Sequence, residues 1–118
     1  MARFKLTIIL GSGARIGPGK AQLLESIRDT GSISSAAREM GMARTRAHDL
    51  IESINTAFEM PVVVAATGGQ HGGGTMLTEF GHDLLDRYRR LEAQMQADYG
   101  DDLAAFEAKA RPAAGPKI

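Results

Sequence analysis

Four nearby side chains in the middle of the sequence can each make hydrogen bonds to a polar or anionic partner. They are Arg44, Thr45, Arg46 and His48, and they stand at the start of residues 43–58, which have helical spacing. An arginine can donate two hydrogen bonds to the O6 and N7 atoms of guanine, and a threonine hydroxyl can bond base edges or phosphates. These residues therefore predict a recognition helix, 43–58, whose first turns enter the major groove of DNA.

The residues before this helix have the pattern of a helix-turn-helix. Gly41 separates the two helices and can adopt a left-handed conformation at little cost. Ser32 or Ser34 can cap the first helix, and Ser34 and Ser35 are expected to contact phosphates. Each helix has an apolar side, made of Ile33, Ala36, Ala37 and Met40 in the first and Ala47, Leu50, Ile51 and Ile54 in the second. The same pattern also fits an ordinary helical hairpin, because short helix-glycine-helix patterns recur by chance.

Composition restricts the class of protein. The chain has 118 residues and no cysteine, which indicates one domain without disulfides or thiolate chemistry, with a slight preference for the cytoplasm. No apolar run reaches the ~20 residues that a membrane span needs. The formal net charge is zero, which argues against coating nucleic acid by bulk charge. Basic residues still gather locally, at Arg38, Arg44 and Arg46.

The N-terminal third predicts a strand at 4–10, a glycine-rich loop at 11–19 and a helix at 20–30. The loop sequence GSGARIGPGK resembles a phosphate-binding loop because Lys20 follows the glycines. However, the spacing differs from that motif, and Ala21 stands where a serine or threonine should bind magnesium. We therefore expect no nucleotide site here, and no cofactor elsewhere.

A second β segment follows the helix-turn-helix. Pro61 ends the helical pattern, residues 62–67 are rich in β-formers, and a returning strand starts near Thr75. The connecting loop contains five glycines, so its backbone can approach a partner closely. We expect a wing at 67–75 that contacts the DNA backbone through Gly69, Gln70, His71 and Gly72. The alternative for His71 is an ordinary solvated loop residue.

A long amphipathic helix is expected to begin near Thr78 and to extend to about residue 99. Its apolar stripe is longer than one small core can cover, so we interpret it as a dimerisation surface made of Phe80, Leu84, Leu85, Tyr88, Leu91 and Met95. Arg87, Arg89 and Arg90 are expected on its solvated face. Residues 100–102 interrupt the helix, a short amphipathic piece follows at 103–108, and the end has the composition of a flexible tail.

An enzyme is not expected. The spacing places no carboxylate pair, no His-Cys set and no nucleophile beside a base. His48, His71 and His82 are scattered and lack the spacing of metal ligands. We therefore assign no catalytic and no metal-binding residue.

These features together resemble the N-terminal domain of the ModE molybdate-responsive regulators, winged-helix relatives of the LysR type. The resemblance covers residues 4–95 and is carried by three groups of residues: GSISSAAREMGM, the core positions Ala47, Asp49 and Ile51, and ATGGQHGGGTMLTEFGHDLL. It implies a homodimer that binds double-stranded DNA at a pseudo-palindromic operator. It also implies an α+β, mostly α, fold: a winged helix-turn-helix domain at 1–99 with a small antiparallel sheet and a long dimerisation helix, followed by an extension at 100–118.

The sequence departs from this family at three places. We expect the 118 residues to hold the DNA-binding domain without the C-terminal molybdate-binding modules. Arg44 and His48 replace aromatic residues, and Val64 and Ala65 replace a Glu-Arg pair in the strand before the wing. The last change, together with the apolar run 62–66, keeps a second hypothesis open. It is a winged-helix interaction module in which DNA binding is weakened or supplied by a partner.

Overall fold

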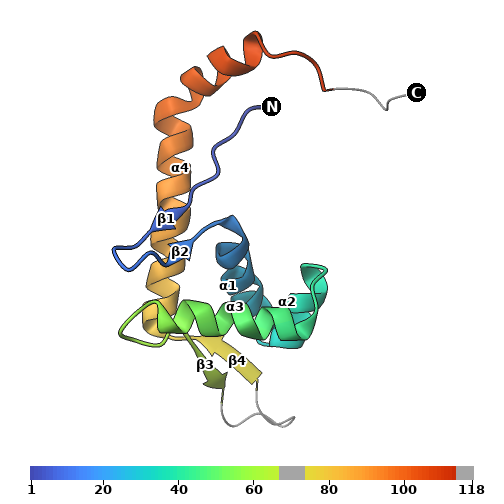
Figure 1. The fold of residues 1–118 in the computed structure, drawn as a ribbon, viewed down its shortest axis with the longest axis vertical. Coiled ribbons are helices and arrows are strands. Elements are labelled where there is room, and N and C mark those ends of the chain that lie inside the picture. Colours follow the sequence, from blue (N-terminus) through green and yellow to red (C-terminus); the bar gives the residue numbers. More distant parts are fainter. Residues whose placement is uncertain (67–73, 114–118) are drawn as a thin grey trace, which may run out of the picture.

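The structure is a computed structural model that describes residues 1–66 and 74–113. It is mainly helical, as expected, and it has two small antiparallel sheets where one was expected. In chain order the elements are β1 (Ile8–Ile9), β2 (Arg15–Ile16), α1 (Pro18–Thr30), α2 (Ile33–Glu39), α3 (Arg44–Thr56), β3 (Val63–Ala66), β4 (Gly74–Leu77) and α4 (Glu79–Ala108). In Figure 1, α3 crosses the lower half of the molecule, with β3 and β4 below it and the start of α1 above it.

Local signals explain the helix-turn-helix. Helix α1 has proline in its first turn, which fits the fixed φ of that residue, and it ends at Gly31 in the left-handed region (φ 71°). The Ser32 hydroxyl then accepts a hydrogen bond from the Ser35 N–H (3.2 Å) and caps α2. Gly41, also left-handed (φ 65°), separates α2 from α3. The predicted turn at Gly41 and the predicted cap at Ser32 are therefore confirmed.

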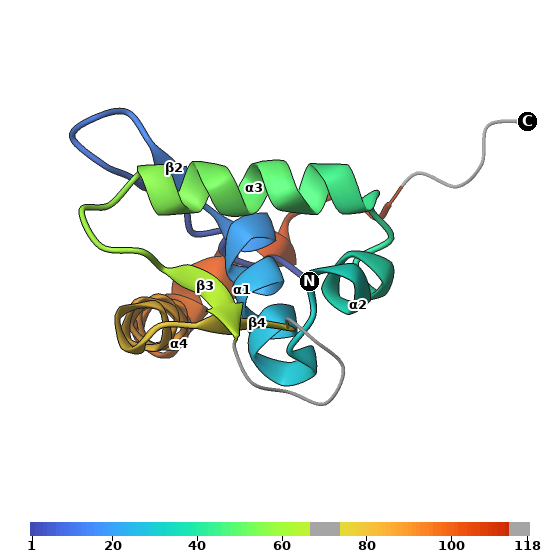
Figure 2. The same cartoon turned by 90° about the horizontal axis from the view of Figure 1, so that it is seen from below.

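The hydrophobic core lies where α1 meets the other helices and the β3–β4 sheet. Its large, fully buried side chains are Leu23, Leu24, Ile27, Ile54, Val62, Leu77 and Leu85. Three of them come from α1, the helix that Figure 2 shows in the middle of the domain, between α3 and α4. Burying that much apolar surface is the main force that holds α3 in place.

The N-terminal segment forms a hairpin rather than one strand and a loop. β1 has only two residues and pairs antiparallel with β2, so that Ile8 faces Ile16 and Ile9 faces Arg15. The hairpin closes by hydrogen bonds from Leu10 N–H to the Ala14 carbonyl and from Gly13 N–H to the Leu10 carbonyl, both 2.8 Å. The prediction of a strand at 4–10 was thus too long, and β2 was missed. Burial of Ile16 anchors β2 to the core.

The wing strands are fixed to the helix-turn-helix at both sides. β3 and β4 pair antiparallel, with Val63 opposite Leu77 and Ala66 opposite Gly74. The Thr75 N–H donates to the carbonyl of Gly31, at the α1–α2 turn (2.9 Å). The loop residues Gly69, Gln70, His71 and Gly72 lie outside the described residues, so their predicted contacts stay predictions.

Asn55, near the end of α3, joins the recognition helix to β3. Its side-chain oxygen accepts hydrogen bonds from the N–H groups of Val62 (2.8 Å) and Val63 (3.0 Å), and its amide donates to the Val63 carbonyl (3.0 Å). We expect Asn55→Ala to lower the free energy of unfolding by about 1–3 kcal/mol, because part-buried backbone groups lose their partner. Urea unfolding would measure this loss. The exposed neighbour Thr56→Ala is the control, and equal midpoints for both variants would contradict the role of Asn55.

Helix α4 begins where the sequence predicts, and its two halves are placed differently. Its first N–H groups are capped by Thr78, whose hydroxyl accepts from Gly81 N–H (2.9 Å). The break predicted at residues 100–102 occurs at Tyr99 (φ −123°). In Figure 1 the first half of α4 packs on the domain and the second half projects away from it.

The predicted dimerisation stripe needs a correction, because its middle belongs to the core of this chain. Leu85 and Tyr88 are 1% and 2% exposed, so neither is accessible to a second copy. Tyr88 donates its hydroxyl hydrogen to the Leu6 carbonyl (2.6 Å), and burial, with the nearby Glu92 carboxylate, raises the pKa of this hydroxyl. Phe80 is half-buried and packs edge-on against Phe58, with ring centroids 5.4 Å apart.

Arg89 was expected in solvent and instead bridges α1 and α4. Its guanidinium pairs with Glu25 (3.1 Å) and with Glu92 (2.8 Å). Burial alone would lower the pKa of Arg89, but the hydrogen bonds to Glu92 and Glu25 outweigh it and raise this pKa above its ordinary value. Arg28 adds a longer contact to Asp86 on α4 (3.7 Å). These pairs help to fix the angle between the helix-turn-helix and the long helix.

Candidate nucleic-acid interface

The predicted recognition residues lie on three sides of α3. Ala47, Ile51 and Ile54 are buried and define the inner side of the helix. Given 3.6 residues per turn, Thr45 lies on the outermost ridge, opposite that side, and is followed there by Asp49 and Glu52. Arg44 and His48 flank the ridge on the side of the wing, and Arg46 flanks it on the side of the β1–β2 hairpin. All four predicted residues are exposed.

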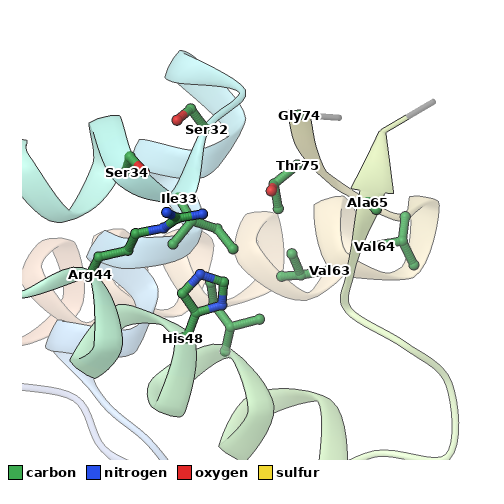
Figure 3. A pocket seen from close by; sticks show the side chains of 11 residues that line it. Ser32, Ile33, Ser34, Arg44, His48, Val63, Val64, Ala65, Gly74 and Thr75 are labelled. Atoms are coloured by element: carbon green, nitrogen blue, oxygen red, sulfur yellow. The ribbon is translucent and has the colours of Figure 1, made fainter. Parts of the chain in front are cut away.

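A groove between α3 and the wing strands, here called the wing-side groove, has a volume of about 360 Å³. Arg44 and His48 line one wall, Ser34 lines the second, and Thr75 lines the third. Figure 3 shows Arg44 and His48 rising from α3 into the space that faces Ser34 and the β strands. The groove therefore combines hydrogen-bond donors with an apolar floor formed in part by Ile33 and Val63.

The serines of the α2 start have different roles. Ser34 lines the wing-side groove, as does Ser32, which the sequence indicated only as a cap. Ser35 uses its N–H in the cap and does not line the groove. Thr75 was also missed as a lining residue. No local pattern indicates this position, because a hydrogen bond between distant residues, from the Thr75 N–H to the Gly31 carbonyl, holds Thr75 beside the α1–α2 turn.

The charges are divided between two parts of the domain. On α1 and α4, Arg28, Arg87 and Arg89 all form ion pairs. Within residues 1–66 and 74–113, the arginines of the helix-turn-helix, Arg38, Arg44 and Arg46, form none. The arginines around α3 thus carry guanidinium groups without ion pairs, beside the exposed carboxylates of Glu39, Asp49 and Glu52. A free guanidinium group matches the charge of a phosphate.

Two sequence interpretations are corrected at this interface. Asp49 was taken as a core position and is exposed on the outer ridge of α3, because the inner side is already filled by Ala47, Ile51 and Ile54. The apolar run 62–66 is the second case, because in the sequence it favours the interaction-module hypothesis. Val62 and Val63 are 0% and 5% exposed and belong to the core, while Val64 and Ala65 line the wing-side groove.

Two other kinds of site are absent from the part of the chain that the structure describes. In 1–66 and 74–113, no three side chains of His, Cys, Asp or Glu gather as metal ligands would. In the same ranges, no helix combines the length and apolar character required to cross a membrane.

The arrangement of α1, α2, α3 and the β3–β4 hairpin defines a winged helix-turn-helix domain. The same fold occurs in the full-length LysR-type regulator LysG of Corynebacterium glutamicum with bound effector arginine. That structure matches with a TM-score of 0.57 at 19% identity, over 80% of this chain and 30% of that chain.

The sequence relatives identify the group more closely. The molybdenum-pterin-binding protein MopB of Rhodobacter capsulatus is 45% identical over 82 residues, 70% of this chain and 30% of that protein. The DNA-binding transcriptional dual regulator ModE of Escherichia coli K12 is 36% identical over 107 residues, 91% of this chain and 40% of that protein. No protein-family model matches the chain. The chain is a winged-helix domain homologous to ModE and MopB, and it spans less than half of their length.

Proposed function

We propose that this chain binds duplex DNA with sequence specificity and regulates transcription, with α3 in the major groove. The observation that carries this proposal is the set of arginines without ion pairs among the described residues, Arg38, Arg44 and Arg46, around α2 and α3. The homology supports it, since the Escherichia coli relative is a DNA-binding transcriptional regulator rather than an enzyme. Such a chain would act in the compartment that holds the DNA, which is the cytoplasm in bacteria.

The charge order along α3 favours insertion by its first turn. Arg44, Thr45 and Arg46 form that turn, whereas the outer ridge continues with the carboxylates of Asp49 and Glu52. Phosphates repel those carboxylates, so the later turns should rise out of the groove. Ala43 provides no side-chain cap, which leaves the first N–H groups of α3 able to donate to phosphate oxygens. Arg44 and Arg46 are then the long side chains nearest the base edges.

The wing-side groove is suited to one strand of the DNA backbone. Ser34 and Thr75 supply hydroxyl donors on opposite walls, and Arg44 supplies a charge. Hydroxyl and guanidinium groups of this kind bind phosphate oxygens and fix the register of the protein on the duplex. Ser35 and the wing residues 69–72 remain further proposed contacts to the same backbone.

The proposed function can be tested without knowledge of the operator. Duplexes of random sequence would be selected with the purified chain, and the enriched sequence would be tested for binding at about 50 and 200 mM salt. We expect a defined sequence, because base contacts specify, and a steep loss of affinity with salt, because phosphate contacts release counterions. Selection of no sequence, together with binding that salt does not change, would refute the proposal.

We further propose that the chain acts as a homodimer through the exposed apolar side chains of α4 from Leu91 to Phe106. Leu91, Tyr99 and Phe106 are 47%, 53% and 78% exposed, and Met95 is half-buried between the first two. Their spacing continues the apolar stripe that begins with the buried Leu85 and Tyr88 in the first half of α4. Burying such an exposed apolar surface against a second copy would stabilise a dimer. Two joined copies would match a pseudo-palindromic operator.

Leu91→Asp should shift the chain from dimer to monomer, because the new carboxylate would be buried unpaired in the interface. Sedimentation equilibrium would measure the change as a dissociation constant. Ala93→Asp adds the same charge to an exposed position on the other side of α4 and should leave the dimer intact. If both variants keep the mass of the wild type, the surface has been assigned wrongly.

A connection to molybdenum is proposed from homology alone, since MopB is a molybdenum-pterin-binding protein. We propose that the target genes serve molybdenum-related metabolism. Measuring the affinity for the selected duplex with and without molybdate shows whether this chain itself responds to molybdate. If the affinity is unchanged, any molybdate response would have to come from another partner. The second hypothesis, an interaction module, loses its main support because Val62 and Val63 are buried in the core.

A further inference from the structure

A second groove lies on the other side of α3. It has a volume of about 280 Å³ and is here called the hairpin-side groove; its lining includes Arg15, Gly17, Gly19, Lys20, Arg46 and Leu50. In Figure 1 the hairpin and the start of α1 lie above α3, while the wing strands lie below it. The recognition helix is therefore bordered by a groove on each side.

Three cations from three separate elements line this groove. Arg15 comes from β2, Lys20 from α1 and Arg46 from α3, and no carboxylate is part of the lining. In the described ranges 1–66 and 74–113, none of the three forms an ion pair. Arg15 and Arg46 are exposed and Lys20 is half-buried. No anionic side chain of the lining balances this concentration of charge.

Lys20 links the two other elements that line the hairpin-side groove, β2 and α1, to α3 by hydrogen bonds. Its ammonium donates to the Arg15 carbonyl (2.8 Å) and to the Ser53 hydroxyl on α3 (3.3 Å). An ammonium has three N–H donors, so one remains for a partner in the groove. The same two hydrogen bonds tie the hairpin and α1 to the recognition helix, which holds Arg15 and Lys20 beside Arg46.

We propose that the hairpin-side groove binds the sugar-phosphate backbone of the DNA strand on the side of α3 away from the wing. This inference deepens the proposed function and rests on it. The major groove is about 12 Å wide and an α-helix with side chains is about 10–12 Å across, so a helix in it has a backbone on each side. The wing-side groove faces one backbone. Arg15 and Lys20 face the other, beside Arg46, and phosphate is the partner that the charge of Arg15 and Lys20 fits.

Arg15→Gln is the decisive variant, because the Arg15 side chain is exposed and only its backbone supports Lys20. For loss of one phosphate contact, the slope of log affinity against log salt should fall by about 0.9. Affinity should fall on the order of fivefold, equally for the selected and for unrelated sequences. Lys20→Gln should act in the same direction, with circular dichroism confirming that it still folds.

The matched control is Arg111→Gln, which removes the same charge three residues beyond the end of α4. In Figure 1 that end of α4 lies far from α3. Arg15→Gln with the affinity and salt slope of Arg111→Gln would overturn this inference and leave the proposed function standing. A loss for Arg15→Gln that is confined to the selected sequence would also overturn it, because it would indicate base reading. Failure of the wild type to bind DNA at all would instead refute the proposed function itself.

Discussion

Replacing Gly81 with alanine is expected to lower the free energy of unfolding by about 3 kcal/mol, the upper range for overpacking in a core. A Cβ at Gly81 would overlap the carbonyl oxygen of Val62, and it would lie 3.2 Å from the Val62 carbonyl carbon and 3.3 Å from the Leu77 Cβ. The first obstacle is backbone and cannot rotate away. Val62 is also fixed, because its carbonyl accepts from the Thr78 N–H (3.0 Å) beside the α4 cap. The wing and α4 would have to separate.

The predicted destabilisation by Gly81→Ala is opposite in sign to the usual effect of this substitution in a helix. Alanine in place of glycine normally stabilises a helix interior by up to ~1 kcal/mol. Gly100→Ala, in the same helix, is the control, because the nearest atom to its added Cβ is the flexible Gln96 amide nitrogen at 3.7 Å. Thermal or urea unfolding should therefore rank Gly100→Ala at or above the wild type and Gly81→Ala far below it. Two variants of equal stability would show that the Val62 backbone does not approach α4 this closely.

Arg44→Ala is expected to reduce discrimination between the selected site and single-base variants by about 1–3 kcal/mol, or roughly 5–150-fold, if the arginine reads a guanine. The Arg44 side chain is exposed and, within 1–66 and 74–113, has no ion-pair partner. Its removal should therefore leave the unfolding transition unchanged. Competition binding with a set of mutated duplexes measures the discrimination directly.

Arg90→Ala is a suitable control for this second variant. Arg90 is exposed on α4, about half a helical turn around the axis from the buried Leu85 and Tyr88. It removes the same charge without touching α3, so it should keep the full base preference. Equal preference in both variants would mean that Arg44 contacts only phosphate, or no DNA.

Local patterns in the sequence were sufficient for the helix-turn-helix. Ser32 and Gly41 act through their own backbone neighbourhood, and the apolar periodicity of α3 places Ala47, Ile51 and Ile54 inside, as predicted. Propensity, capping and periodicity are all properties of nearby residues. The long C-terminal helix was predicted for the same reason.

Contacts between distant segments could not be predicted in this way. The Arg89–Glu25 pair joins residues 64 positions apart, and a charged helix face looks the same in sequence whether it is paired or solvated. An apolar stripe likewise does not distinguish core from interface, which is why Leu85 and Tyr88 were assigned to a dimer. The grouping of Arg15 and Lys20 with Arg46 depends on the hairpin, and its second strand has only two residues.

The most direct test that α3 enters the major groove is methylation interference on the selected duplex. Methyl groups at guanine N7 lie in the major groove, and those at adenine N3 lie in the minor groove. With α3 in the major groove, N7 methylation should block binding at two clusters of guanines about one helical turn, 10–10.5 base pairs, apart. Interference at adenine N3 alone, or at no discrete position, would contradict the placement of α3 and with it the proposed mode of DNA recognition.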